Sequence, residues 1–305
     1  MPAIKKARAI RRGAVVGIAA PAGPIDAERI EAGEALLRRL GFEPQRQADL
    51  GDRLGYLAGD DPRRASELMA LIDDAKVEAI VCARGGYGSA RILSRLDPAR
   101  VRKARKPLVG YSDITSLLLW QRRIAGLMGI HGPMLERGSA LDAESERALV
   151  RALTGAGPLP RLGGHTRVGG WGEGRLTGGS LSLVVASLGT PFEIDTRDAI
   201  LMLEDTGEPP YRIDRMLEQL RAAGKLDGLV GIGLGSFDGC EDARYPDREL
   251  EDVLADALDG LGVPVVDGLP FGHGDVNLAW PMGARAAIDG DRGEVELLES
   301  AVAAR

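Results

Sequence analysis

Lys106-Pro-Leu-Val-Gly-Tyr-Ser-Asp-Ile-Thr115 is the stretch of sequence that indicates the fold most clearly, because it joins an expected strand directly to an expected helix. The apolar run Pro107-Leu-Val-Gly110 is typical of a buried strand, and a helical pattern follows from 113 to 124. Strands that alternate with helices form a parallel sheet covered on both faces. The stretch therefore predicts an α/β domain with Ser112 at the turn.

The same alternation continues on both sides of this stretch and defines the first domain. Apolar runs predict strands, and amphipathic runs, such as the one that begins at Asp26 and ends before Gly41, predict helices. The expected strands cover 15–20 and 78–83, and the expected helices cover 26–40, 63–73 and 89–96. In such sheets, ligands bind beyond the carboxyl ends of the strands, where the glycine-rich turns after 83 and 110 fall.

Beyond the first domain the composition changes. Gly, Pro and Arg dominate from 151 to 174 with little apolar periodicity, which predicts a linker. The strands and helices expected after it are mixed in order, which favours a second, α+β domain. We therefore expect a nucleophile domain at 1–150, a Gly/Pro-rich linker at 151–174 and a domain carrying the acid and base at 175–305.

Composition and charge exclude several classes of function. The chain has 305 residues and a formal net charge of −6, and an acidic pI of about 5.3 argues against a nucleic-acid partner. No run approaches 18 apolar residues, so we expect no membrane span. The basic Lys5–Arg12 precedes an apolar run that is short and ends in a Pro/Gly turn, so we interpret that run as a first strand rather than a signal peptide and expect a cytoplasmic protein.

Ser112 is the first candidate for chemistry. A serine on a sharp turn from strand to helix projects its hydroxyl above the sheet, where the helix N-terminus supplies N–H groups to an oxyanion. Ile114 stands where the usual nucleophile elbow has a second glycine, so the spacing is a weak signal. The other interpretation makes Ser112 the N-cap of the helix, and the local pattern alone favours that cap.

A glycine-rich turn, Arg84-Gly-Gly-Tyr-Gly88, follows another expected strand. The dinucleotide-binding fingerprint fails because Arg91 stands at its third glycine position. N–H groups of Gly85 or Gly86 near Ser112 would complete an oxyanion hole, although a purely structural turn fits the pattern equally well. Arg84 and Tyr87 are candidate substrate-binding residues, since a guanidinium suits a terminal carboxylate.

A serine nucleophile needs a base and an orienting carboxylate. Among His131, His165 and His273, the last lies in an accessible turn flanked by glycines and ranks first as base. His165 is expected in solvent, and His131 is either buried and hydrogen-bonded or a second candidate. For the carboxylate the candidates are Glu204, Asp205 and Glu208, and we favour Glu204 because it ends a strand near the functional edge of the sheet.

Taken together, these motifs resemble the LD-carboxypeptidases, also called muramoyltetrapeptide carboxypeptidases, of serine peptidase family S66. The resemblance runs in order from about Gly17 to Asp289. The segments that carry it are Arg84-Gly-Gly-Tyr-Gly-Ser89, Gly110-Tyr-Ser-Asp-Ile-Thr115, Gly178-Gly-Ser-Leu-Ser182, Leu203-Glu-Asp-Thr-Gly-Glu-Pro-Pro-Tyr-Arg-Ile-Asp-Arg-Met216 and Phe271-Gly-His-Gly274.

The resemblance implies a cytoplasmic, homodimeric serine hydrolase that releases terminal D-alanine from murein tetrapeptides in peptidoglycan recycling, with no metal or organic cofactor. Its Ser-His-Glu triad would fall on Ser112, His273 and Glu204, and the oxyanion would meet the N–H groups of Asp113 and of Gly86 or Gly85. The implied fold is an N-terminal domain like the class I glutamine amidotransferases and a smaller, β-rich C-terminal domain.

Trp171 departs from this pattern, because many relatives have small residues there. Other members of the family cleave acyl-nucleotide amides of processed microcin C and stack the base on an aromatic ring, so Trp171 is a candidate for base stacking. A linker tryptophan that covers the second domain is the other interpretation. A hypothesis of a different class is a non-catalytic sugar- or nucleotide-binding module, in which Ser112 is only a cap.

Overall fold

The first expected strand, β2 (Val15–Ala19), lies inside a six-stranded sheet of strand order β13-β6-β5-β4-β2-β3. The neighbouring strands from β3 to β6 pair in parallel, and only β13 is antiparallel. In this computed structural model, residues 4–46 and 50–303 are described. The other strands of the sheet are β3 (Glu43–Arg46), β4 (Val77–Cys82), β5 (Leu108–Gly110), β6 (Gly129–His131) and β13 (Trp280–Met282).

Six helices accompany this sheet, and several begin where an aspartate caps them. Asp60, Asp97 and Asp142 each accept backbone N–H groups of the helix that follows. Asp26 occupies the expected cap position but pairs with Arg53 and makes no cap bond. The helices are α1 (Ala27–Arg39), α2 (Asp61–Asp73), α3 (Ser89–Ile92), α4 (Pro98–Ala104), α5 (Thr115–Trp120) and α6 (Ala143–Thr154).

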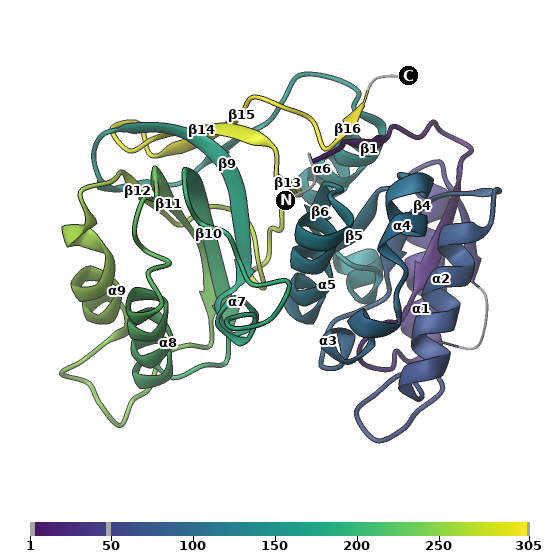
Figure 1. Cartoon of the computed structure of the whole chain (residues 1–305), viewed down its shortest axis with the longest axis horizontal. Coiled ribbons are helices and arrows are strands. Elements are labelled where there is room, and N and C mark those ends of the chain that lie inside the picture. The colour runs from purple at the N-terminus through teal and green to yellow at the C-terminus, as the bar shows by residue number, and fades with distance from the viewer. Residues whose placement is uncertain (1–3, 47–49, 304–305) are drawn as a thin grey trace. The chain divides into compact units, whose positions relative to one another are not determined.

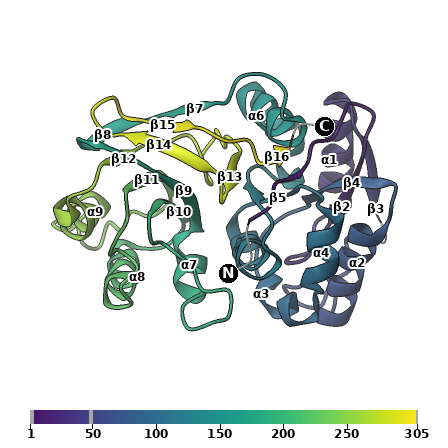
Figure 2. The same ribbon diagram turned by 45° about the horizontal axis from the view of Figure 1, so that its top comes forward.

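The strand order places the functional edge of this sheet. The crossover through α1 leads from β2 outward to β3, whereas the one through α2 leads back past β2 to β4. Because such crossovers are right-handed, α1 and α2 cover opposite faces of the sheet (Figure 2). The connections after β2 and after β4 thus step in opposite directions across the sheet. In α/β sheets, ligands bind at the carboxyl ends of two such strands.

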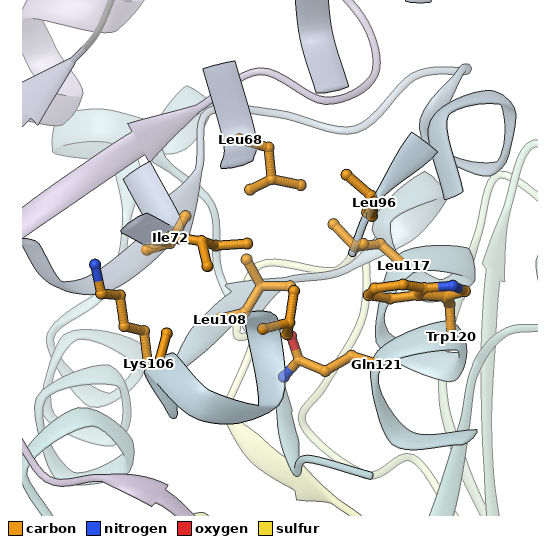
Figure 3. Close-up of a pocket in the computed structure, with 11 residues that line it drawn as sticks. Leu68, Ile72, Leu96, Lys106, Leu108, Leu117, Trp120 and Gln121 are labelled. Carbon is orange, nitrogen blue, oxygen red and sulfur yellow. The ribbon is translucent and has the colours of Figure 1, made fainter. Parts of the chain in front are cut away.

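The interior between the six-stranded sheet and its helices is closely packed. Figure 3 shows Leu68 and Ile72 of α2, Leu108 of β5, and Leu117 and Trp120 of α5 around one remaining gap. The gap has a volume of about 10 Å³, at the lower limit for a single water molecule. It belongs to the hydrophobic core and offers no room for a substrate.

A second sheet has eight strands in the order β7-β15-β14-β9-β10-β11-β12-β8. Strands β9 to β12 are parallel and the outer strands are antiparallel. Its strands are β7 (Arg161–Gly163), β8 (His165–Val168), β9 (Trp171–Ser180), β10 (Ala199–Thr206), β11 (Gly231–Asp238), β12 (Val265–Asp267), β14 (Arg285–Asp289) and β15 (Glu294–Leu297).

Three helices connect the parallel strands of the second sheet, α7 (Leu181–Ala186), α8 (Pro210–Ala222) and α9 (Leu250–Leu258). The crossovers all step in one direction across the sheet, so right-handed connections place the three helices on one face. Figure 1 shows them together on that face.

The contacts divide the chain into two units. The first holds the described residues up to Gly157, Leu278–Met282 and those from Ser300, and the second holds Pro158–Asn277 and Gly283–Glu299. A two-stranded sheet of β1 (Ala7–Arg8) and β16 (Val302–Ala303) joins the two ends of the chain within the first unit, and α6 lies beside β16 (Figure 2).

The expected fold class is confirmed: a parallel α/β unit and a separate β-rich unit. The interval 151–174 differs from the linker expectation, because it carries the end of α6, strands β7 and β8 and the start of β9. Polar residues in β7 and β8 and glycines in β9 make up much of these strands, so they lack the apolar alternation that identifies a strand. No helix in the described part of the chain is long and apolar enough to span a bilayer.

Candidate active site

Ser112 follows the end of β5 and begins a 3₁₀ turn, Ser112–Ile114, that leads into α5. Its backbone φ is 58°, in the left-handed region that non-glycine residues avoid. The cap position of the turn is Tyr111 rather than Ser112, so the helix-cap interpretation is wrong. Ser112 is partly exposed between buried neighbours, as a serine on a nucleophile elbow would be.

Two glycines make room for this tight turn. A Cβ at Gly110 would lie 2.6 Å from Cγ2 of Ile114, so Gly110 lets the isoleucine occupy the position where the usual elbow has glycine. A Cβ at Gly85 would lie 2.9 Å from the Cβ of Ser112 and 3.4 Å from the backbone nitrogen of Asp113. The turn after β4 therefore packs directly against the elbow after β5.

The glycine-rich turn needs its glycines for conformation as well. Gly86 has a φ of 102° and Gly88 a φ of 132°, both unfavourable for other residues. The Gly85 carbonyl accepts a hydrogen bond of 3.0 Å from the N–H of Gly23, in the loop after β2. Loops after three neighbouring parallel strands thus meet at the carboxyl edge of the first sheet, next to Ser112.

The two expected substrate-binding residues of this turn are partly or largely exposed. The Arg84 guanidinium lies 3.5 Å from a Glu136 carboxylate oxygen and donates to the Pro24 carbonyl at 3.2 Å. Tyr87 is 50% exposed and packs edge-on against Tyr56. Their roles in binding substrate stay predictions.

Glu204 and His273 come together in the second unit, 69 residues apart in sequence. Oε2 of Glu204, which is fully buried near the end of β10, lies 2.6 Å from Nδ1 of His273. Gly272, with a φ of 108°, allows this contact, because a Cβ there would lie 2.8 Å from the same carboxylate oxygen. The pair has the geometry of an imidazole oriented by a carboxylate.

The competing carboxylates are engaged elsewhere. Asp205 accepts the N–H of Ser182 at 2.7 Å, and Glu208 lies 3.3 Å from Arg212. Burial raises the pKa of Asp205 above its ordinary value, and the neighbouring Glu204 charge adds to that shift.

The other histidines are also accounted for. His131 is fully buried in β6 and stacks on Trp280 with ring centroids 4.8 Å apart. His165 is exposed in β8, as expected. Trp171 begins β9 in the second unit and is 64% exposed, so it does not cover that unit's core. In the described part of the chain, no three His, Cys, Asp or Glu side chains gather as metal ligands would.

Sequence reasoning missed two charged side chains beside the Ser112 elbow, Arg64 and the carboxylate of Asp113. Arg64 is 1% exposed and Asp113 is 2% exposed. The available signal was the position of Arg64 on the apolar stripe of α2, four residues before Leu68, where a charge is out of place unless it is paired.

A parallel α/β unit with a strained serine elbow and a β-rich unit with a carboxylate–histidine pair are the features of a serine hydrolase. Two family models match the chain, the LD-carboxypeptidase N-terminal domain at residues 16–132 and the LD-carboxypeptidase C-terminal domain at residues 173–288. The chain belongs to the LD-carboxypeptidase family, as the sequence motifs predict.

Individual relatives agree with this assignment. The chain is 38% identical to a probable murein peptide carboxypeptidase of Bacillus subtilis, covering 93% of this chain and 91% of that one. It is 36% identical to the murein tetrapeptide carboxypeptidase of Pseudomonas aeruginosa, covering 91% and 94%. A solved structure, muramoyltetrapeptide carboxypeptidase from Oxalobacter formigenes, matches with a TM-score of 0.84 and 30% identity over 93% of this chain and 97% of that chain. The microcin C7 self-immunity protein of Escherichia coli is 28% identical.

Proposed function

We propose that the protein is a serine-type LD-carboxypeptidase that hydrolyses the L,D-amide bond releasing the terminal D-alanine of murein tetrapeptides. Family membership and the names of relatives at 36–38% identity support this substrate class. The observation that carries the proposal is the 2.6 Å contact between Glu204 and His273. A binding module without catalysis gives no reason for that contact between residues so far apart in sequence.

In the proposed mechanism, Ser112 is the nucleophile and His273 the general base. Nε2 of His273 takes the hydroxyl proton as Oγ attacks the amide carbonyl, and then gives it to the departing D-alanine amine. Glu204 accepts a hydrogen bond from the Nδ1–H, which fixes the neutral tautomer and stabilises the imidazolium as it forms. Water then releases the acyl group from Ser112 by the same proton transfers in reverse.

The proposed oxyanion hole consists of the backbone N–H of Asp113 and that of Gly86 or Gly85. Its support is the close packing of Gly85 on Ser112, which brings the turn after β4 against the elbow. Loss of one such donor typically costs about 2.7–4 kcal/mol of transition-state stabilisation. We assign Arg84 to the terminal carboxylate of the substrate, with Tyr87 beside it.

Mass-spectrometric detection of D-alanine released from UDP-muramoyl tetrapeptide tests this proposal. We expect the wild type to cleave the tetrapeptide and leave the matching pentapeptide intact, and the Ser112→Ala variant to lose at least about 10³-fold in rate. A folded wild type that cleaves neither peptide would contradict the proposed substrate.

Cleavage of aminoacyl-nucleotide amides is the second candidate function. The 28% identity to the microcin C7 self-immunity protein of Escherichia coli supports it. The exposed Trp171 does not add to that support, because it lies at the opposite end of β9 from Ser180, the residue that pairs with Glu204. Incubation of the wild type with an aminoacyl sulfamoyl nucleoside tests it by release of the amino acid. Cleavage of this amide with no cleavage of tetrapeptide would replace the main proposal.

The family resemblance also underlies two further parts of the proposal, a homodimer and a cytoplasmic location. Sedimentation equilibrium of the purified chain tests the dimer, and fractionation of cells that produce it tests the compartment. A monomer at micromolar concentration would contradict the dimer.

A further inference from the structure

The peptide units at Gly88 and Ser89 lie where the glycine-rich turn ends and α3 begins, and they are tied to the residue after the nucleophile. The Asp113 carboxylate accepts the N–H of Ser89 at 2.8 Å and also that of Gly88. The Ser89 hydroxyl donates to the Asp113 backbone carbonyl at 2.6 Å. Three hydrogen bonds therefore join the elbow after β5 to the turn after β4.

Arg64 holds the same segment from the other side. Its Nη1 donates to the Gly88 carbonyl at 2.8 Å and to the Pro21 carbonyl, and its Nε donates to the Gly59 carbonyl at 3.2 Å. Its Nη2 pairs with Asp61. One buried guanidinium therefore connects the loop after β2, the start of α2 and the glycine-rich turn.

Gly88 is fitted to this arrangement. A Cβ there would lie 2.8 Å from Nη1 of Arg64 and 2.6 Å from Cδ2 of Leu57, and its φ of 132° excludes other residues as well. The N–H of Gly88 thus faces the Asp113 carboxylate while its carbonyl faces the Arg64 guanidinium. The turn has little freedom to move away from Ser112.

Stability alone is a poor explanation for these two charges. Asp113 bonds to the N-terminus of α3, which has only four residues, so a cap there stabilises very little helix. Burial raises the pKa of the Asp113 carboxyl group above its ordinary value. The N–H and hydroxyl groups of Ser89, the N–H of Gly88 and the Arg64 charge oppose that shift. Burying charged groups costs free energy that a small apolar cluster would not.

We propose that the Asp113 carboxylate and Arg64 are positioning residues that clamp the Gly88–Ser89 segment and so set the distance between Ser112 and the oxyanion turn. The proposal rests on the proposed function, in which the N–H groups of Asp113 and Gly86 or Gly85 meet the oxyanion. Catalytic groups must be held to within about half an ångström for full rate, and the clamp fixes both walls of the hole through one carboxylate.

The test compares Asp113→Asn with a matched control, Asp97→Asn. Asp97 caps α4 in the same unit with two similar bonds, to the N–H groups of Ala99 and Arg100. We expect Asp113→Asn to lower kcat for D-alanine release by about 10- to 100-fold with KM unchanged. The control should keep kcat within about twofold, and both variants should keep Tm within about 3 °C.

Ser89→Ala separates the parts of the clamp. It removes the hydroxyl, which donates to the Asp113 carbonyl and also interacts with the carboxylate, but keeps both N–H bonds to the carboxylate, so we expect a smaller loss of kcat than for Asp113→Asn. A wild-type kcat in folded Asp113→Asn would overturn the proposal. An equal loss of kcat in Asp97→Asn, or a loss that only follows a lowered Tm, would overturn it as well.

A second measurement tests the clamp independently of the proposed substrate. Labelling of Ser112 by a fluorophosphonate, followed by intact mass and peptide mapping, needs the nucleophile and oxyanion hole but no murein peptide. A wild type that is labelled but cleaves no tetrapeptide contradicts the proposed substrate, and the clamp then predicts slower labelling of Asp113→Asn than of Asp97→Asn. Equal labelling rates for the two variants, or a wild type that is not labelled at Ser112, would overturn the clamp.

Discussion

Ser112 holds a backbone conformation that costs a residue with a side chain about 1–3 kcal/mol. Its φ is 58°, and only Arg105 and Asp198 share a positive φ among the described residues other than glycine. Close packing maintains this conformation, since Gly110 lies under Ile114 and Gly85 lies against Ser112 itself. The strain places the hydroxyl at the carboxyl edge of the sheet, where the proposed chemistry needs it.

Gly85→Ala tests how closely the turn must approach the serine. The new methyl group would lie 2.9 Å from Cβ and 3.0 Å from Oγ of Ser112, so either the turn or the serine must shift. Because displacements of about 1 Å can cost 10²-fold, we expect kcat/KM for tetrapeptide to fall by about 100-fold.

Gly163→Ala in β7 is the control for this prediction, because a Cβ there meets no atom within 4 Å. Steady-state kinetics of both variants, with thermal unfolding to check the fold, provide the measurement. Near-normal activity in Gly85→Ala would mean that the turn does not form a wall of the oxyanion hole.

Single residues of the site were predictable to different degrees. Glu204 could be chosen from its place at the end of a strand, but no local pattern indicates that it contacts His273, because the 69 residues between them must fold first. Arg64 was missed although it lies on the apolar stripe of α2, because three of its hydrogen-bond partners are backbone carbonyls in separate loops, and such partners leave no trace in the sequence.

At the scale of elements, apolar runs predicted the buried strands well. The expected strand 15–20 is β2 (Val15–Ala19), and the expected strand 78–83 is β4 (Val77–Cys82). Edge strand β3 was missed because its residues, Glu43–Arg46, are polar and include a proline. Strand β9 was missed because its glycines allow close packing, as at Gly174, where a Cβ would lie 2.7 Å from the Asp198 carbonyl. Burial without apolar side chains leaves no periodic signal.

The junction of β10 and α7 gives a prediction for pH dependence. Asp205 accepts the N–H groups of Ser182 at 2.7 Å and Thr206 at 2.9 Å. Burial, and secondly the charge of Glu204, raises the pKa of Asp205 in the folded protein above the ordinary 3.8. The folded state therefore takes up a proton at higher pH than the unfolded chain does. The stability that this protonation of Asp205 contributes is fully present below pH 3.8 and is lost as the pH rises through the folded pKa.

Asp205→Asn removes this titration. We expect the free energy of unfolding of the wild type, relative to that of the variant, to increase as the pH is lowered from 7 to about 4.5. Urea unfolding of both proteins across that range measures the difference. A difference that shrinks toward acid would show that Asp205 is stabilised in its charged form, against the effect of burial.

At the scale of the whole molecule, the proposed machinery is divided between the two units. Ser112 and the glycine-rich turn belong to the first unit, while Glu204 and His273 belong to the second. Each unit has its own sheet and its own set of strand-end loops. If Ser112 and His273 act in the same step of one reaction, removal of either residue abolishes the rate enhancement that depends on both.

That dependence is measurable with Ser112→Ala, His273→Ala and the double variant. Groups that act in one step are not additive, because removing either already abolishes the step they share. We expect each single variant to lower kcat for D-alanine release by about 10³-fold or more, and the double variant to be no slower than the slower single variant. If the two units worked independently, the losses would multiply. A double variant slower by the product of the two losses would therefore exclude proton transfer between Ser112 and His273, even if each residue alone proved essential.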